Sequence, residues 1–465
     1  MADTGSRRIL GFPNEFWIGF VILIGIFLKI VYNVDAGYAV STHNLGEWKA
    51  IVDNIPNEGH LGVIQYYLTY HRLPTFDPAL LSGYRTPPLF YIFSALILKI
   101  FYLSMGWELG TVLHCIQCLN AVFVMIGTFS GAMLLSKCGV RGRRMVWALM
   151  FLMFFSGFYN LGAAFDNTAM AYMFGMLSLN KMLRWYETRR RRDLITGAVM
   201  TALAMMTSLS MIVLAVPMGC LFVLAAVRGR YSEKKAGTPT GQAGHGRSLA
   251  REAGLYAAVA LIPGLFYPIR NKVLFGTPLI GFDAEPEAWQ NIGIYGPLQR
   301  LGLPDMASLR HLHLTAHSFY EYNIWGQTVK TAVADESALN LDMAFPRSLA
   351  VILVLAVFAF TVTALLLMIK TLADRETKPE HKLFMISGFL SILIGYVIIC
   401  FLNPTISAMN FRKIALLPVF MLIGVGKGGD AAGDSLIAAG LSHLATGLIL
   451  IISVLSAFLF GFYAV

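Results

Sequence analysis

Three carboxylates lie where they could take part in chemistry, at the edges of long apolar runs. Glu58 falls within Asn57-Glu58-Gly59-His60, and Asp53 lies a few residues before it. Asp166 lies in a turn between two apolar runs that is so short that its carboxylate must sit at membrane depth. An ionisable group there is costly and usually faces a cavity. Because a positioned carboxylate can take the proton of a reacting hydroxyl, these three residues are the candidate catalytic groups.

The same carboxylates also have structural explanations. Glu58 precedes a segment in which polar and aromatic residues share one face of a helix, so it can be the capping residue of a solvated interfacial helix. The residues on that face are Asn57, His60, Tyr67 and His71. Asp166 can cap the helix that starts at Thr168, and this role is compatible with a functional one.

A second group of residues could bind an anion. Arg270, Arg412 and Lys413 lie at span ends that are expected to face away from the cytoplasm. Arg85, which follows Tyr84, lies in the first large loop. Basic residues at outer helix ends run against the positive-inside bias, so a phosphate partner is worth proposing. The alternative is that these side chains are anchors whose charged heads snorkel to the interface.

Neither a metal nor a cofactor is indicated. His311, His313 and His317 have a spacing that resembles metal ligands, but no carboxylate adjoins them. Cys115 and Cys118 form a single C-x-x-C without the second pair that a zinc site would need, so they are interpreted as packing residues. The chain also has no P-loop, G-x-S-x-G or kinase motif.

The composition indicates what kind of protein must position these residues. Of the 465 residues, 57% are hydrophobic and 13% are charged, whereas a soluble domain has about 25% charged residues. This argues against a soluble enzyme and predicts an all-α polytopic membrane protein embedded in the lipid bilayer. The net charge of +10 is interpreted as a signal of membrane topology, and no nucleic-acid partner is expected.

The apolar runs predict about 11 transmembrane helices. They are expected near residues 15–34, 112–136, 145–164, 168–184, 194–210, 211–228, 254–271, 348–369, 383–402, 411–426 and 436–462. A further run, 87–102, is at the short limit for a span. It is expected to lie in the interface, because the basic clusters at 141–144 and 189–192 would otherwise face outside. The N-terminus is then cytoplasmic and the C-terminus lies outside.

Residues 1–465 are expected to form a single transmembrane domain with two large outer loops. The loops are 35–111, which contains the interfacial helices, and 272–347. Residues 229–253 are expected to form a flexible cytoplasmic loop, because they are rich in Gly, Lys, Thr and Gln. No internal repeat is evident, which weakens the case for a transporter built from inverted repeats.

Several short motifs together resemble those of a known family. The first outer loop contains the acidic motif at 57–60, then His71-Arg72-Leu73-Pro74, then an aromatic-x-x-Pro-Pro-Leu-x-Tyr signature from Tyr84 to Tyr91. Asp166 supplies a second acidic turn, and Arg412 lies in a late basic motif. On these residues the chain resembles the GT-C membrane glycosyltransferases. The branch nearest to it holds the protein O-mannosyltransferases and the bacterial aminoarabinose transferases.

The resemblance implies an inverting, metal-independent sugar transfer from a polyprenyl-phosphate carrier to a glycan, lipid or protein acceptor at the non-cytoplasmic face. Its implied base is Glu58 or Asp53, while Asp166 would position the acceptor or support the base. The residues implied in substrate binding are Asn57, His60, His71, Tyr84, Arg85, Arg270, Arg412 and Lys413. The expected location is a bacterial plasma membrane, since the outer loops contain no N-x-[ST] sequon lacking proline.

The chain departs from this family at the first motif, which usually offers an Asp where Asn57 stands. A comparison with a His-Asp-x-Gly variant instead puts Asn44 at the acidic position. Because an Asn cannot act as a general base, either Glu58 or Asp53 takes that role or the chain is a catalytically altered relative. The other alternative, a flippase or transporter of lipid-linked sugars, would place charges near the middle of the bilayer, and the middles of the expected spans are nearly free of charge.

Overall fold

The computed structural model describes residues 8–9, 12–38, 44–51, 55–236, 242–279, 291–293, 295–304, 322–334, 344–430 and 436–462. Apart from an antiparallel pair of two-residue strands, β1 (Arg8–Ile9) and β2 (Phe12–Pro13), the regular elements in these residues are helical. Asp53 and the three histidines at 311, 313 and 317 lie outside the described residues.

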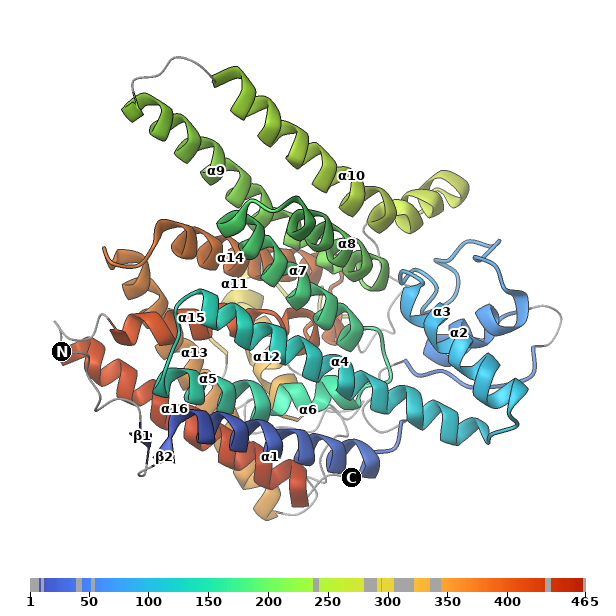
Figure 1. The fold of residues 1–465 in the computed structure, drawn as a ribbon. Coiled ribbons are helices and arrows are strands. Elements are labelled where there is room, and N and C mark those ends of the chain that lie inside the picture. The colour runs from blue at the N-terminus through green and yellow to red at the C-terminus, as the bar shows by residue number, and fades with distance from the viewer. Residues whose placement is uncertain are drawn as a thin grey trace.

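The helices that coincide with the expected spans form the body of the molecule (Figure 1). They are α1 (Asn14–Asp35), α4 (Leu109–Lys137), α5 (Arg143–Phe154), α6 (Ser156–Ala163), α7 (Thr168–Thr188), α8 (Arg191–Thr207), α9 (Ala215–Ala236), α10 (Gln242–Phe275), α13 (Ala344–Ala373), α14 (Pro379–Leu402), α15 (Leu417–Asp430) and α16 (Leu436–Phe462). Shorter elements join them. These are α2 (Gly59–Tyr70), α3 (Leu89–Leu98) with the π-helical η2 (Lys99–Ser104), η3 (Leu209–Leu214), α11 (Pro297–Leu301), α12 (Ile324–Val333), η5 (Ile406–Ala408) and η6 (Phe411–Ile414).

The expected membrane architecture is confirmed in outline. Among the described residues, seven helices are long and apolar enough to cross a membrane, and nine spans result if two bent helix pairs each count as one. Every expected span coincides with a helix, and the two outside this set of nine are α7 and α8. Helix α7 packs against α4 on one side and α8 on another, so it is shielded by protein and needs fewer apolar residues than a lipid-facing helix. The count of about 11 spans therefore stays a prediction.

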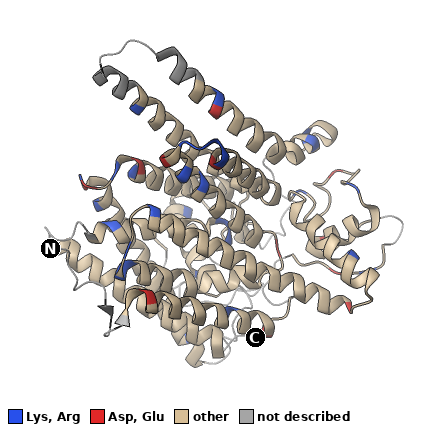
Figure 2. Cartoon of the chain, viewed as in Figure 1, with Lys and Arg blue, Asp and Glu red and all other residues tan. Residues whose placement is uncertain are grey.

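Successive spans, with each bent helix pair counted as one span, alternate in direction and give the bundle two ends. We call the end with residues 137–144, 189–192 and 378–382 the basic end, and the end with α2, α3 and the Asp166 turn the loop end. Figure 2 shows Lys and Arg gathered at the ends of helices on the side opposite α2 and α3. This asymmetry has the form that the positive-inside rule describes.

The structure adds detail to two of the expected segments. Residues 229–253 contain the end of α9, which continues to Ala236, and the start of α10, which begins at Gln242. The apolar run 87–102 forms α3 and most of η2, and this short helix packs on α2 beside the bundle (Figure 1). It is too short to qualify as a span by itself, and its position in the interface stays a prediction.

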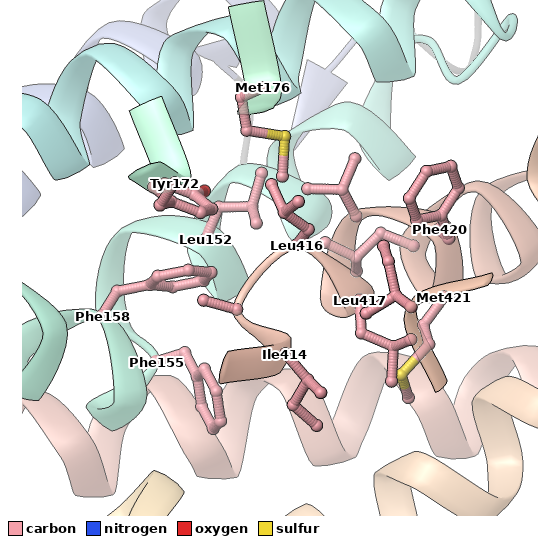
Figure 3. Packing of buried hydrophobic residues seen from close by; sticks show 14 of the residues in the cluster. Leu152, Phe155, Phe158, Tyr172, Met176, Ile414, Leu416, Leu417, Phe420 and Met421 are labelled. Carbon is pink, nitrogen blue, oxygen red and sulfur yellow. The ribbon is translucent and has the colours of Figure 1, made fainter. Parts of the chain in front are cut away.

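A bend in one span brings the site segments together. Helices α5 and α6 meet at Phe155 with a bend of 42°. A Cβ added at Gly157, just past the bend, would lie 2.4 Å from the Phe411 ring, so only glycine lets η6 approach α6 this closely. Figure 3 shows Phe155 and Phe158 facing the segment that holds Ile414 and Leu416. Arg412 thereby reaches the loop end of α6.

Candidate functional site

The Asp166 turn is organised as a helix start. The Asp166 Oδ1 atom accepts a hydrogen bond from the backbone N–H of Thr168 at 2.8 Å and a second from the Thr168 hydroxyl. These bonds satisfy donors at the start of α7 that have no partner within the helix. The capping role expected from the sequence is therefore present, but it uses only one of the two carboxylate oxygens.

The other oxygen of Asp166 is paired with Arg412. The Arg412 Nη1 atom lies 2.7 Å from Asp166 Oδ2, although the two residues are 246 positions apart in the chain. The Arg412 side chain is only 4% exposed and the Asp166 side chain only 10%. Arg412 itself is held in η6, where its backbone N–H donates to Asn410 Oδ1 at 2.9 Å. A charge-assisted hydrogen bond of this length in a desolvated place is among the stronger polar contacts in proteins.

The surroundings keep Asp166 ionised. Burial is the largest single influence and would raise the pKa of this carboxyl. The Arg412 guanidinium, the nearby His60 and the two bonds from Thr168 together outweigh burial, so the pKa lies below its ordinary value. A carboxyl with this pKa is a weak proton acceptor, which favours a role in holding Arg412 or a substrate group over that of general base.

Two amide side chains of α4 donate hydrogen bonds to backbone carbonyls of the same turn. Asn120 donates to the carbonyl oxygens of Ala164 at 2.6 Å and of Asp166 at 3.1 Å. Gln117 donates to the Ala163 carbonyl at 2.9 Å and to the Ala36 carbonyl at 2.8 Å, which ties the turn to the end of α1. Neither residue was predicted from the sequence. The sequence feature that could have indicated them is that amide side chains are unusual inside an apolar run.

The start of α2 is capped by backbone rather than by a side chain. The N–H groups of Gly59, His60 and Leu61 donate to carbonyl oxygens of residues 82, 44 and 45. Glu58 occupies the N-cap position, but its side chain makes no capping hydrogen bond and is exposed. The carboxylate is therefore not used by the helix.

Asn57 and Tyr84 serve the internal structure of the first loop. Asn57 Nδ2 donates to the Lys49 carbonyl at 2.8 Å and to Gln65 Oε1 at 2.7 Å. The buried Tyr84 hydroxyl lies 3.0 Å from the Asn57 carbonyl oxygen and 3.1 Å from that of Gly62. Burial raises the pKa of Tyr84, so its hydroxyl stays a neutral donor. Both residues were expected to bind substrate. In the structure the Asn57 amide nitrogen and the Tyr84 hydroxyl donate to groups of the loop, and the substrate-binding role stays a prediction.

His60 is the first-loop residue that the structure connects most directly with Asp166. It is half-buried, its Nδ1 atom lies 2.9 Å from the Tyr91 hydroxyl, and the two rings stack with centroids 5.8 Å apart. It also lies close enough to Asp166 to help hold that carboxyl ionised. His71, in contrast, ends α2 with a left-handed backbone and lies 3.2 Å from the Lys99 amine at an exposed position.

The other basic residues that were predicted to bind substrate lie either at the first outer loop or in η6. Arg270 donates to the Pro74 carbonyl at 2.7 Å, so it ties α10 to the first loop, where Tyr267 also donates to the Tyr84 carbonyl at 2.5 Å. Arg85 is half-buried in the same loop. Lys413 follows Arg412 in η6 and is half-buried near Cys400.

Helix α12 is a part of the site region that the sequence analysis did not single out. The Thr331 hydroxyl accepts the backbone N–H of Phe411 at 3.0 Å, and the Ser156 hydroxyl donates to the Ala332 carbonyl at 2.7 Å. Helix α12 therefore joins η6 to the start of α6, and it carries the buried Lys330. Two sequence features could have indicated this helix: an amphipathic pattern and an Asn at the N-cap position. In the structure the Asn323 side chain accepts the N–H of Gly326 at 2.9 Å.

The described residues contain no cluster of three or more His, Cys, Asp or Glu side chains that could hold a metal ion. The pair formed by Asp166 and Arg412 has one carboxylate, and the guanidinium already occupies one of its oxygens. A divalent ion bound by protein usually takes several oxygen ligands. The prediction of a metal-independent reaction stays a prediction.

The pKa of Asp166 predicts how stability depends on pH. Since the folded pKa is lowered, the carboxylate stabilises the fold above its unfolded pKa of about 3.9, and this contribution is lost as the pH falls through the folded value. The difference in melting temperature between the parent and Asp166→Asn is expected to be constant between about pH 7 and 5 and to shrink below about pH 4. Thermal unfolding in detergent across this range measures it. A difference that stays constant at the lowest pH would contradict a titrating ion pair.

Comparisons with known proteins bear on the fold. No family model matches the chain, and no curated protein matches it in sequence. The apo structure of the Archaeoglobus fulgidus oligosaccharyltransferase superposes with a TM-score of 0.50 at 12% identity, covering 97% of this chain and 56% of that one. The fold is GT-C. The chain thus spans only about half the length of this relative, and the likeness concerns the fold alone.

Two further solved structures are similar over most of this chain. The same oligosaccharyltransferase, tethered to an acceptor peptide containing the NVT sequon, gives a TM-score of 0.47 at 12% identity and covers 96% of this chain and 55% of that one. ArnT from Cupriavidus metallidurans, in the apo state, gives a TM-score of 0.39 at 10% identity and covers 94% and 78%.

Proposed function

We propose that the chain is a membrane glycosyltransferase that moves a hexose or pentose from a polyprenyl-phosphate carrier to an acceptor. The observation that carries the proposal is the buried contact between Asp166 and Arg412 at the loop end. A membrane protein has little reason to build such a pair from two distant turns for stability alone, because removing two charges from water is costly. The GT-C fold supports the proposal, since the oligosaccharyltransferase with this fold is a sugar-transferring enzyme.

The location of the pair suits a donor that is anchored in lipid. The head group of a polyprenyl-phosphate sugar lies at the membrane surface, and the loop end holds the first outer loop, the Asp166 turn and η6. If the basic end faces the cytoplasm, as the positive-inside rule indicates, the loop end faces outward. A bacterial plasma membrane with a cytoplasmic N-terminus and an outward C-terminus fits this orientation.

The chemistry requires two charges of opposite sign. In an inverting transfer the acceptor oxygen forms a bond to the anomeric carbon, and the bond from that carbon to the phosphate oxygen breaks, with its electrons leaving on the phosphate. A guanidinium beside the phosphate stabilises this developing charge, which is the role we assign to Arg412. The acceptor proton passes to a carboxylate, and Glu58 and Asp53 are the candidates.

Asp166 then positions the Arg412 guanidinium and does not accept the proton of the acceptor hydroxyl. Both of its oxygens already accept hydrogen bonds, one set from Thr168 and one from Arg412. It fixes the direction of the Arg412 guanidinium, and an orientation fixed before binding lowers the reorganisation needed during reaction. His60, on the Tyr91 ring, is placed to bind the sugar or acceptor.

The proposal is tested by sugar transfer in membranes that contain the full-length chain. Radiolabelled undecaprenyl-phosphate hexoses and pentoses serve as donors, and the released undecaprenyl phosphate is measured. We expect either Glu58→Gln or Asp53→Asn to lower transfer by about a hundredfold, within the range found when a general base is removed. Full activity in both variants would overturn the base assignment. Full activity in Asp166→Ala as well would overturn the proposed function.

A further inference from the structure

A lysine lies deep inside the first span. Lys29 is on α1, six residues before its last residue, Asp35, so its Cα lies about 9 Å along the helix from the loop end. Its side chain is buried, with 1% relative exposure. The expectation that span middles are nearly free of charge is therefore incomplete for α1. An ionisable residue at this depth is costly and, by default, marks a functional place.

Lys29 has neither an ion-pair partner nor a hydrogen-bond partner among the described residues. Its amine is a buried nitrogen without a hydrogen-bond acceptor. An amine in such a place would be strongly unfavourable unless something else stabilises it.

An aromatic ring provides that stabilisation. The Lys29 Nζ atom lies 4.1 Å from the centroid of the Tyr159 ring, within the range of a cation–π contact, which is strengthened by the absence of water. The Tyr159 ring also packs on Tyr32 at 5.8 Å and stacks on Phe460 at 5.1 Å. Three helices, α1, α6 and α16, thus meet around one ring. Within the part of the chain that the structure describes, the Tyr159 hydroxyl has no hydrogen-bond partner, so the ring rather than the hydroxyl makes the contacts.

Tyr159 lies on the short helix that leads into the Asp166 turn. Helix α6 is one half of a bent span, and it ends three residues before Asp166. Hydrogen bonds hold both ends of α6, from Ser156 to α12 at its start and from Gln117 and Asn120 to the carbonyls after it. The contact of Lys29 with Tyr159 holds its middle against α1. A rotation or shift of α6 would move the Asp166 carboxylate relative to Arg412.

We propose that Lys29 is a positioning residue, which lies on the Tyr159 ring, holds α6 in place and so keeps Asp166 against Arg412. The catalytic part of this inference rests on the proposed function. The contact itself and its effect on the ion pair do not.

The first test uses transfer in membranes with full-length variants. Lys29→Met keeps the length of the side chain and removes the cation, and it is expected to lower transfer at least about tenfold, while Lys29→Arg restores it to within about threefold of the parent. Tyr159→Phe keeps the ring, and its transfer rate is expected to stay within about threefold of the parent. Tyr159→Leu removes the ring and is expected to lower the transfer rate as much as Lys29→Met does. Full activity of Lys29→Met, or equal loss in Tyr159→Phe and Tyr159→Leu, would overturn the proposal.

The second test needs no donor. The coupling between Asp166→Asn and Arg412→Gln is measured by a double-mutant cycle of thermal unfolding in the parent, Lys29→Met and Lys29→Arg backgrounds. We expect the coupling to shrink in Lys29→Met and to return in Lys29→Arg. An unchanged coupling in Lys29→Met would overturn the positioning role. If the parent shows no transfer with any donor but the coupling follows this pattern, the proposed function fails and the positioning role stands.

Discussion

Asp166→Asn is expected to lower sugar transfer by at least about a hundredfold, the loss typical of removing a preorganised electrostatic group. The Asn amide can still accept the Thr168 bonds, so the start of α7 is retained. The substitution removes the charge that directs Arg412 and leaves a buried guanidinium without its counter-ion. Breaking a buried pair in this way also costs about 3–5 kcal/mol of stability. Initial rates with labelled donor and melting temperatures of the same preparation measure the two effects.

The chain offers a matched control at the opposite end of the bundle. Asp193 is also buried and paired, with Lys181 Nζ at 3.7 Å and Arg184 Nε at 3.4 Å, but it lies at the basic end. Asp193→Asn is expected to lower the melting temperature while the transfer rate of the folded fraction stays near that of the parent. If both substitutions lower transfer in proportion to the stability they remove, the ion pair of Asp166 is structural and the assigned role is wrong.

Asp166 could be identified from the sequence alone, because a carboxylate in a very short turn between apolar runs is costly and is usually functional. Arg412 stood out for a related reason, since a cation at an outer helix end opposes the usual bias. Their contact could not be predicted, because nothing in the spacing of two residues 246 positions apart says which helices are neighbours. That information arises from packing, through the bend at Phe155 and the close approach of Phe411 to Gly157.

For two residues of the first outer loop, the sequence features that suggest substrate binding are also those of a structural role. Asn57 and Tyr84 lie in the motif region, and polar groups there look alike whether they bind a sugar or a carbonyl oxygen of their own loop. Lys29 was missed for a different reason. A single lysine barely changes the mean hydropathy of a 22-residue run, and only the structure shows that it faces a tyrosine rather than lipid.

Gly59→Ala is expected to open the first outer loop and to lower transfer by at least about tenfold, because steric strain at a crowded site adds to the backbone penalty. Gly59 has a φ of +75°, and a Cβ there would lie 2.6 Å from the Asn44 carbonyl oxygen and 2.6 Å from the Gly46 nitrogen. Since the Asn44 carbonyl also accepts the N–H of His60, a shift of residues 44–46 would displace the start of α2 and with it His60 and Glu58. Limited proteolysis of residues 44–108 and the transfer rate are the two measurements.

Gly106→Ala is the control that separates the effect of steric crowding at Gly59 from the effect of backbone strain. Its φ is +72°, close to that of Gly59, but a Cβ there would meet nothing within 4 Å. Gly106→Ala therefore carries only the penalty of a left-handed alanine, about 1 kcal/mol, and is expected to leave both proteolysis and transfer close to those of the parent. The comparison depends on the contact between residues 44–46 and the start of α2. Equal effects of the two substitutions would mean that this contact does not hold the loop, and that Glu58 and His60 are placed by something other than the crossing of these backbones.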